Sequence, residues 1–288
     1  KDLKLRSFPR GTHRIKKINT ETKDIVQGIF PNIRPLNAIS WLLRNSFDNK
    51  TQYYFYETAK DGINFNSYEN LINEDVYRDY NQRIGYSETE GTEEYYKEIQ
   101  ERITKLRSTL NLSKLVSVSA GAYASTMHTL DLSTKKYSKL IYDYEINKPK
   151  KLNSNIPFSK EAEIDGIKYN QGKDSYHHFL SLNENAYNLS NYHAPAAPTL
   201  LNSEAQKENL ETMTQEITVA GDYEISVGKI IRIIIPKSLG TDATGLKDKL
   251  LGGKYMITNI LHQFGTQYEM VLTIQKDSSD TDIDGKVI

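Results

Sequence analysis

The chain contains no cysteine, a single tryptophan among 288 residues, and no net charge. Without cysteine it can form no disulfide, thiolate nucleophile or thiolate-ligated zinc site. The 37 basic and 37 acidic side chains cancel, so bulk electrostatics give no reason to expect nucleic-acid readout. No apolar run reaches the roughly 18 to 20 residues that span a bilayer, so stable membrane insertion is not expected.

The sequence begins at Lys1 and continues with charged residues, so we expect no signal peptide. Either the N-terminus is processed or the sequence starts partway through a longer chain. The length of 288 residues allows two or three modest domains or one large core.

Tyrosine is abundant, with 20 tyrosines against eight phenylalanines. A tyrosine ring is apolar and its hydroxyl is polar, which suits partly hydrated interfaces. A compositional bias that also favours Lys, Asn and Ile explains the same numbers, so both interpretations stay open.

A helix and a hairpin are predicted near the start. Apolar residues at helical spacing around Pro35, which suits a first turn, predict an amphipathic helix within residues 31–47. Two aromatic or alternating runs flank Asp61-Gly62, so residues 51–66 predict a β-hairpin. Ser67 can cap a short helix after it.

A second amphipathic helix is predicted over residues 88–112. Its apolar face would consist of Tyr95, Ile99, Ile103, Leu106 and Leu110. Acidic side chains stand near its start and basic ones near its end, an order that complements the helix dipole. We therefore interpret the acidic cluster of Glu93, Glu94 and Glu98 as a solvated helix start and not as a metal site.

The middle of the chain reads as strands followed by a long loop. Residues 115–143 are rich in strand formers, and residues 137–144 predict one strand. Residues 148–203 lack periodicity and are rich in Asn, Ser, Lys and Pro, which predicts an extended, loop-rich excursion with at most short strands. Residues 200–214 resemble a short helix.

The last third gives the clearest pattern. Four strands joined by turns are predicted at residues 217–220, 227–235, 255–264 and 268–274. Consecutive strands with turns indicate an antiparallel β-barrel or sandwich. The tail from residue 277 to 288 is polar and acidic.

An ordered series of short motifs runs through this last third: TVAGD at 218–222, VGK at 227–229, LGGKYMIT at 251–258, HQF at 262–264, Tyr268 and KDS at 276–278. The series resembles the second β-barrel of baseplate hub proteins from contractile-tailed (myovirus) bacteriophages. The same barrel occurs in the spike proteins of type VI secretion systems. Residues 34–42, 54–57 and 61–65 are similar to the family's helix and hairpin, while residues 119–123 with Asp131 and Tyr137 match a middle segment less specifically.

The resemblance covers about two thirds of the chain in patches and implies a fold class. That class is α+β, mainly β, with antiparallel β-barrel domains of the tail-tube or hub type, inserted helices and a loop-rich segment. The segments expected are an N-terminal segment at 1–30, a helix-hairpin and mixed α/β domain at 31–147, a loop-rich insertion at 148–214, a barrel portion at 215–277 and an acidic tail at 278–288. Little before Asn32 resembles the family, so either the first barrel is truncated or this hub is shorter.

The resemblance also implies a role without chemistry. Family members are homotrimers whose six similar barrels form a pseudo-sixfold ring, which adapts a threefold central spike to a sixfold tail tube. The expected partners are the chain itself, the spike, the tube proteins and other baseplate proteins. The expected location is the tail baseplate of the virion, after synthesis in the host cytoplasm. We expect no enzymatic activity, no catalytic residue and no cofactor.

The histidines do not form a convincing site in the sequence. His177 and His178 are adjacent, so on a strand they point to opposite faces and cannot readily share one metal with His193. His128 and Asp131, with Ser125 or Ser133, make a catalytic triad only on paper, because no Gly-x-Ser-x-Gly elbow is present. His262 lies in a barrel strand, where the resemblance assigns it a structural role.

Two further motifs have a plainer interpretation. Gly252-Gly253-Lys254 resembles part of a phosphate loop, but Asp248 and Tyr255 replace the glycine and the hydroxyl residue, so a β-turn before a strand is predicted. Asp280, Asp282 and Asp284 match the first half of a calcium loop, and the sequence ends before the twelfth position. We interpret them as a solvated tail.

Three alternatives to the hub remain open. A type VI spike base or a related injection particle would have a longer chain with a further domain and a needle. A tail-associated glycosidase would need two acids across a cleft, such as Glu93, Glu94 or Asp143. A receptor- or carbohydrate-binding module, suggested by the tyrosines, would line a groove with aromatic side chains.

Overall fold

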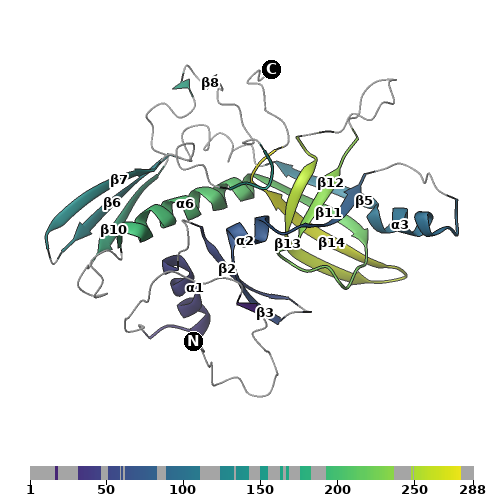
Figure 1. The fold of residues 1–288 in the computed structure, drawn as a ribbon, viewed down its shortest axis with the longest axis horizontal. Helices are drawn as coiled ribbons and strands as arrows, with labels where there is room; N and C mark the ends of the chain where they lie inside the picture. The colour runs from purple at the N-terminus through teal and green to yellow at the C-terminus, as the bar shows by residue number, and fades with distance from the viewer. Residues whose placement is uncertain are drawn as a thin grey trace.

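The structure is a computed structural model of residues 1–288. It describes residues 17–18, 32–46, 51–58, 60, 62–82, 89–110, 124–132, 134–142, 150–154, 163–164, 167–168, 176–182, 193–236, 248 and 250–279. The described chain is mostly β-structure with a few helices, as expected for a mainly β fold (Figure 1). Among the described helices, none is both long enough and apolar enough to cross a membrane.

A six-stranded curled sheet is the centre of the fold. Its strands lie in the order β4 (Val76–Asn81), β12 (Ile230–Ile234), β13 (Gly253–Phe264), β14 (Tyr268–Lys276), β11 (Met213–Ala220) and β5 (Ile103–Leu110). The predicted strands of the last third are all present and pair antiparallel. The expectation of a purely antiparallel barrel is wrong, because β4 pairs parallel to β12.

The sheet is a half-barrel and not a closed barrel. Its edge strands β4 and β5 approach each other through one described bridge, between Asn81 and Arg102. One bridge does not make a ladder, so the sheet curls without closing.

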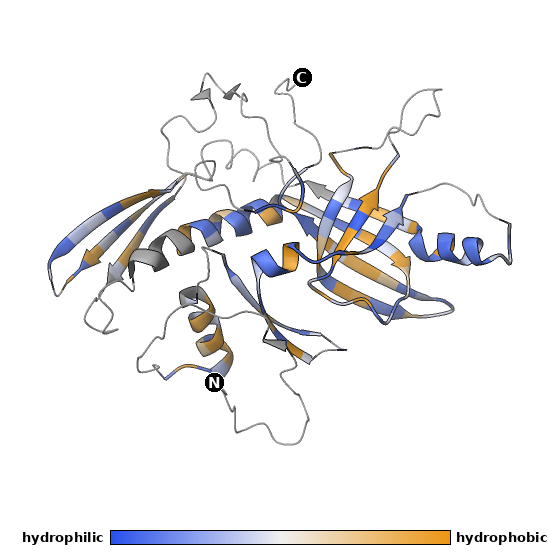
Figure 2. Ribbon diagram, in the orientation of Figure 1, coloured by the Kyte–Doolittle hydropathy of each residue, from blue (hydrophilic) through white to orange (hydrophobic). Residues whose placement is uncertain are grey.

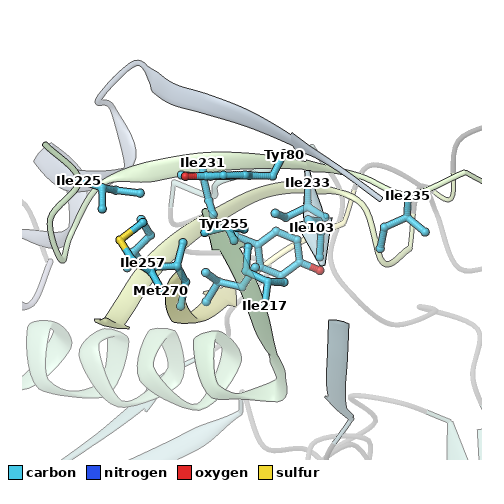
Figure 3. Close-up of a cluster of buried hydrophobic side chains, with 13 residues drawn as sticks. Tyr80, Ile103, Ile217, Ile225, Ile231, Ile233, Ile235, Tyr255, Ile257 and Met270 are labelled. Atoms are coloured by element: carbon cyan, nitrogen blue, oxygen red, sulfur yellow. The ribbon is translucent and has the colours of Figure 1, made fainter. Parts of the chain in front are cut away.

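The concave face of this sheet holds the main core. Alternate residues of each strand point inward, as the period of two in a strand requires. Ile217, Tyr255, Ile257 and Met270 are all fully buried there (Figure 3). Along β11, for example, the inward residues alternate with polar ones, and the hydropathy colour changes along several ribbons of the sheet (Figure 2).

The outer face of the sheet is covered beside β12 and β13. A second core packs there, formed by Tyr68, Leu71, Leu152, Leu210, Ile230 and Met256. It brings together the helix α2 (Tyr68–Ile72), the strand β12 and the helix α6 (His193–Thr212). These central strands are therefore buried on both faces, which accounts for adjacent apolar residues such as Ile230 and Ile231.

The predicted hairpin and the first helices are confirmed. β2 (Tyr53–Thr58) pairs antiparallel with β3 (Gly62–Ser67), and Gly62 has φ +71°, as the turn demands. β1 (Lys17–Ile18) adds a parallel strand to β3. The Oγ of Ser67 accepts a hydrogen bond from the Asn70 amide and caps α2.

The helix predicted within residues 31–47 is α1 (Pro35–Asn45), with Pro35 in its first turn. Phe47, which was expected on its apolar face, lies outside the described residues.

The long helix predicted over residues 88–112 is wrong in its second half. The helix α3 (Glu93–Glu101) is capped by Thr92, whose Oγ accepts from the Tyr95 amide, and Glu93 and Glu94 lie in its first turn as expected. The chain then extends and becomes β5. A bulge at residue 104, where Thr218 pairs with Lys105 and Val219 with Ile103, shifts the inward positions by one. That bulge gives a strand the three-residue apolar spacing of a helix.

A second sheet lies at the far end of the molecule from α3 (Figure 1). Its order is β10 (Tyr176–Leu182), β6 (Ser125–Asp131) and β7 (Lys136–Tyr142), with β10 parallel to β6. The strand predicted at residues 137–144 is thus confirmed as β7. A small hairpin, β8 (Glu163–Ile164) with β9 (Ile167–Lys168), completes the strands.

The interpretation of residues 148–203 as loop-rich is wrong in two places. Residues 176–182 form a full strand, and α6 begins at His193, well before the short helix expected at 200–214. The prolines near its start argue against a helix in the sequence, because proline disrupts a helix interior. Pro195, however, falls in the first turn of α6, where proline is tolerated. α6 runs between the two sheets (Figure 1).

The start of the acidic tail is buried and not solvated. Asp277, Ser278 and Ser279 follow β14 and are each at most 2% exposed. Asp277 and Ser278 accept hydrogen bonds from the amides of Leu152 and Asn153, so this segment is tied to the second core. The boundaries proposed for the five segments of the chain stay a prediction, although the curled sheet combines β4 and β5 with the four strands of the last third.

Candidate functional site

The structure separates the members of the hypothetical catalytic triad. His128, Ser125 and Asp131 all lie on β6. Ser125 and Asp131 are each three residues from His128, and side chains an odd number of residues apart on a strand point to opposite faces, so His128 faces away from both. Ser125 and Asp131 are buried, and Asp131 Oδ1 accepts a hydrogen bond from the Thr134 amide at 3.2 Å. Ser133 lies outside the described residues. These groups cannot act together on one substrate.

The Gly252-Gly253-Lys254 segment is the predicted turn before a strand. The Gly252 amide donates to the Asp248 carbonyl at 3.0 Å, and the Lys254 amide donates to Asn153 Oδ1 at 2.8 Å. Asp248 Oδ1 also accepts from the amides of residues 250 and 251. These backbone donors already have partners, so they do not form an anion cradle.

The acidic candidates stay dispersed. Glu93 and Glu94 are exposed in the first turn of α3, while Asp143, Asp280, Asp282 and Asp284 lie outside the described residues. Within the described part of the chain, no three side chains among His, Asp and Glu are placed to hold a metal ion together.

An open groove of about 280 Å³ lies between the hairpin, α6 and the curled sheet. Tyr54, Tyr56 and Leu71 line one side, and Lys207 and Glu211 of α6 line the other. Burial raises the pKa of Tyr54 above its ordinary range, against a hydrogen bond from Gln52 that lowers it. Tyr54 therefore remains neutral and acts as part of the wall.

The structure does bring aromatic side chains together on two surfaces. The first, called the β6 face, consists of His128, Leu130, Tyr137, Ile141, His177 and Phe179. These residues are direct or diagonal cross-strand neighbours on one side of the second sheet. Phe179 is 80% exposed, Ile141 66% and Tyr137 59%, so this side of the sheet is an uncovered apolar surface.

The other side of the same sheet is covered. Met127 is fully buried, and Tyr142 Oη donates to Asn202 Oδ1 on α6 at 2.5 Å. The contrast shows that α6 supports the sheet from behind and leaves the β6 face free of the described chain.

His128 is the centre of the β6 face. Its Nδ1 lies 2.6 Å from Tyr137 Oη, and its Nε2 lies 3.2 Å from His177 Nδ1. The Phe179 ring stacks on it at a centroid distance of 4.9 Å and an interplanar angle of 14°. Three strands thus hold one imidazole in a fixed plane.

The second aromatic surface, called the hairpin cluster, consists of Tyr223, His262, Phe264 and Tyr268 at the tip of the β13–β14 hairpin. Phe264 stacks on Tyr268 at 4.8 Å and 5°, and His262 Nδ1 lies 2.9 Å from Tyr268 Oη. Phe264 is 67% and Tyr223 70% exposed. His262 is therefore held by a structural contact inside an exposed aromatic group.

Charged residues anchor the loop that carries Tyr223. Asp222 Oδ2 accepts from Tyr77 Oη at 2.9 Å and lies 3.1 Å from an Arg78 nitrogen. Burial, together with the hydrogen bond to Asp222, raises the pKa of Tyr77, so it donates to that carboxylate at neutral pH. The tyrosine–carboxylate–arginine contact fixes Asp222 beneath the hairpin cluster.

The sequence does not predict that the residues of the β6 face, or those of the hairpin cluster, come together on one surface. The sequence shows the excess of tyrosine, but Phe179 and His177 fall in the stretch for which a loop is predicted. The run Tyr176–Leu182 is rich in strand-forming residues, and that signal could have identified β10. No local signal pairs His177 with His128, because their strands are far apart in the sequence.

Comparisons with known proteins give structural neighbours and no family. No protein-family model matches the chain, and no curated protein matches it. A tail protein from Neisseria meningitidis MC58 is similar at 10% identity and TM-score 0.44, over 89% of this chain and 60% of that one. The 43 kDa tail protein of prophage MuSo2 from Shewanella oneidensis is similar at 10% identity and TM-score 0.37, over 86% and 54%. The chain thus spans less than two thirds of either neighbour.

Proposed function

We propose that the chain is a structural protein of a contractile phage tail, and within it a baseplate hub adaptor between the tail tube and the central spike. One observation carries the proposal. The motifs of the hub resemblance, from residue 218 to residue 278, fall on β11, β13, β14 and the turns between them, and these strands form one curled sheet.

The motif glycines have a physical reason in this sheet. Gly228 has φ +88° and Gly253 has φ +106°, and both values favour glycine. A side chain at Gly221 would overlap the ring of Tyr268. The pattern is therefore what this curled sheet requires of its sequence, which supports a shared architecture with the hub barrels.

The surfaces suit a protein that joins others. The second sheet, which carries the β6 face, lies at one end of the long axis, and the curled sheet, which carries the hairpin cluster, lies toward the other end (Figure 1). Exposed groups of stacked aromatic residues are typical of contact sites, because they bury much area at a small entropic cost. An adaptor needs at least two such places, one for each neighbour.

The finer elements of the proposal come from the resemblance. They are a homotrimer, a ring of barrels, contacts with the spike, tube and other baseplate proteins, and a place in the virion baseplate. The described residues contain one curled sheet, while the resemblance implies two barrels in each chain. Residues 1–30, proposed as the remnant of a first barrel, fall almost entirely outside the described residues.

Light scattering on the purified chain, alone and with a co-expressed spike protein, tests the proposal. We expect a trimer of three 33.0 kDa chains, about 99 kDa, either alone or once the spike is present. Phe179→Ser and Phe264→Ser should each weaken one assembly step. Leu36→Ser is the matched control, since Leu36 is also an exposed apolar residue at 70% but belongs to neither surface. A monomer that ignores the spike would overturn the adaptor role.

A further inference from the structure

Three polar side chains meet on the β6 face, one from each strand of the second sheet. His128 comes from β6, Tyr137 from β7 and His177 from β10. His128 Nε2 and His177 Nδ1 are 3.2 Å apart, and His128 Nδ1 is 2.6 Å from Tyr137 Oη. His177 pairs in register with Thr126, so it reaches His128 diagonally across two strands.

We propose that His128 and His177 bind one divalent transition-metal ion, of the zinc and copper class, through Nε2 and Nδ1. In a tetrahedral zinc site with Zn–N bonds of about 2.0–2.1 Å, two ligand nitrogens lie about 3.3 Å apart. The separation of 3.2 Å matches that spacing. The ring centroids are 5.4 Å apart, so the two nitrogens face each other nearly head-on. Both rings must therefore turn about their side-chain bonds for the two lone pairs to converge on an ion beside the N–N line, while the backbone keeps its place.

The metal site needs the tautomer of His128 in which Nδ1–H donates to Tyr137 Oη, and the 2.6 Å contact allows it. When His128 Nδ1–H donates to Tyr137 Oη, its Nε2 carries a lone pair directed at His177. A ligating histidine normally donates its other N–H to such an acceptor, which fixes the ring and raises its basicity. Stacking of Phe179 on His128 holds the ring plane. In that tautomer the first ligand is preorganised in the folded chain.

The donor set determines which ions fit. Two imidazole nitrogens favour zinc, copper or nickel, whereas calcium and magnesium require oxygen ligands. Water or a group from a neighbouring protein takes the remaining positions, because the face is open. Lys139, the exposed cross-strand neighbour of His128, lies on the same face, and its charge opposes a cation. Lys139→Gln is expected to tighten binding a few-fold.

The 3.2 Å distance also fits a direct N–H···N hydrogen bond between the two rings. The two states differ in an observable way. In the hydrogen-bonded pair one of the two nitrogens keeps a proton, whereas in the metal site both are deprotonated and share the ion.

Zinc titration of the untagged full-length chain by calorimetry is the first test, with nitrogen-15 NMR of the imidazoles as the second. We expect one zinc site per chain, lost in His128→Gln and in His177→Gln. Tyr137→Phe should weaken it about tenfold or more, as loss of a second-shell partner does. At saturating zinc, the resonances of His128 Nε2 and His177 Nδ1 should both shift as metal ligands.

Two histidines serve as matched controls. His262 also faces a tyrosine hydroxyl, at 2.9 Å from Tyr268, but has no second histidine at its other nitrogen among the described residues. His178 lies on the same strand as His177 and points to the other face. His262→Gln and His178→Gln should leave zinc binding unchanged.

Three results would overturn the proposal: no zinc binding by the folded chain, binding that survives His128→Gln, or a proton retained between the rings at saturating zinc. The NMR reading uses the wild-type chain, so it decides the question even where a variant folds poorly. The test needs no partner protein, so it is independent of the tail role.

Discussion

Replacement of Asp277, in the buried segment that follows β14, should lower the free energy of unfolding. The carboxylate is buried, and it accepts hydrogen bonds from Tyr68 Oη at 2.7 Å, from the Leu152 amide at 3.0 Å and from Ser278 Oγ at 2.5 Å. It therefore ties α2 and residues 150–154 to the end of the curled sheet.

The structure gives the size and the sign of the effect. Asp277→Ala removes the acceptor of the hydrogen bonds from the buried Tyr68 hydroxyl and Leu152 amide, at about 1–3 kcal/mol each, or about 2–6 kcal/mol in all. Burial raises the pKa of Asp277 above its ordinary value near 3.8, against the hydrogen bonds from Ser278, Leu152 and Tyr68 that lower it. The native state therefore holds the proton to higher pH than the unfolded state does.

Stability from this group is consequently present at low pH and is lost as pH rises through the raised pKa. Asp277→Asn is the matched variant, because it keeps an acceptor for the Leu152 amide but does not titrate. The assay is urea unfolding, followed by circular dichroism, of both proteins from pH about 4 to about 8. The free energy of unfolding of the wild type minus that of Asp277→Asn should fall as pH rises. A difference that grows with pH would show that the fold stabilises the carboxylate, and would refute the reasoning.

Three further substitutions test the packing, each by its shift in the urea midpoint. Gly221→Ala should destabilise the chain and disorder the hairpin cluster, because the added methyl would overlap the Tyr268 ring; unchanged stability would contradict that close approach. Leu272→Ala should cost about 2–5 kcal/mol, since Leu272 is fully buried in the concave core. Ser67→Ala should cost about 0.5–1 kcal/mol through loss of the α2 cap, at the low end because the bond to Asn70 is 3.4 Å long.

Local patterns in the sequence were enough for elements that depend on local chemistry. Pro35 marks the start of α1, Gly62 supplies the positive φ of the hairpin turn, and Ser67 caps α2. The strands of the last third were equally clear, because β-branched residues alternate there between turns. In each case the signal and the structure it causes lie within a few residues of one another.

The errors arose where distant partners decide the outcome. Ile103 and Leu106 have helical spacing, and only the pairing of β5 with β11 reveals that a bulge accounts for it. β4 joins the sheet parallel to β12, and the spacing of apolar residues in the sequence does not predict this contact. The meeting of His128 with His177 depends on the same kind of long-range parallel pairing, of β10 with β6. The abundance of tyrosine thus suggests an interface, but the sequence does not predict where in the fold the aromatic side chains gather.

The edge strands of the half-barrel are less suited to contacts with other chains than the two aromatic surfaces. An unpaired edge strand invites pairing with another chain unless charges oppose it. β5 exposes Lys105 and Arg107 along its edge, and on β4 Arg78 and Asp79 make ion pairs with Asp222 and Arg232. These charges disfavour uncontrolled edge pairing. The β6 face has the exposed Lys139 beside it, but it and the hairpin cluster also present strongly exposed apolar or aromatic side chains, among them Phe179 and Phe264. If the chain is an adaptor, loss of Phe179 or Phe264 should therefore impair assembly more than loss of Lys105 or Arg107.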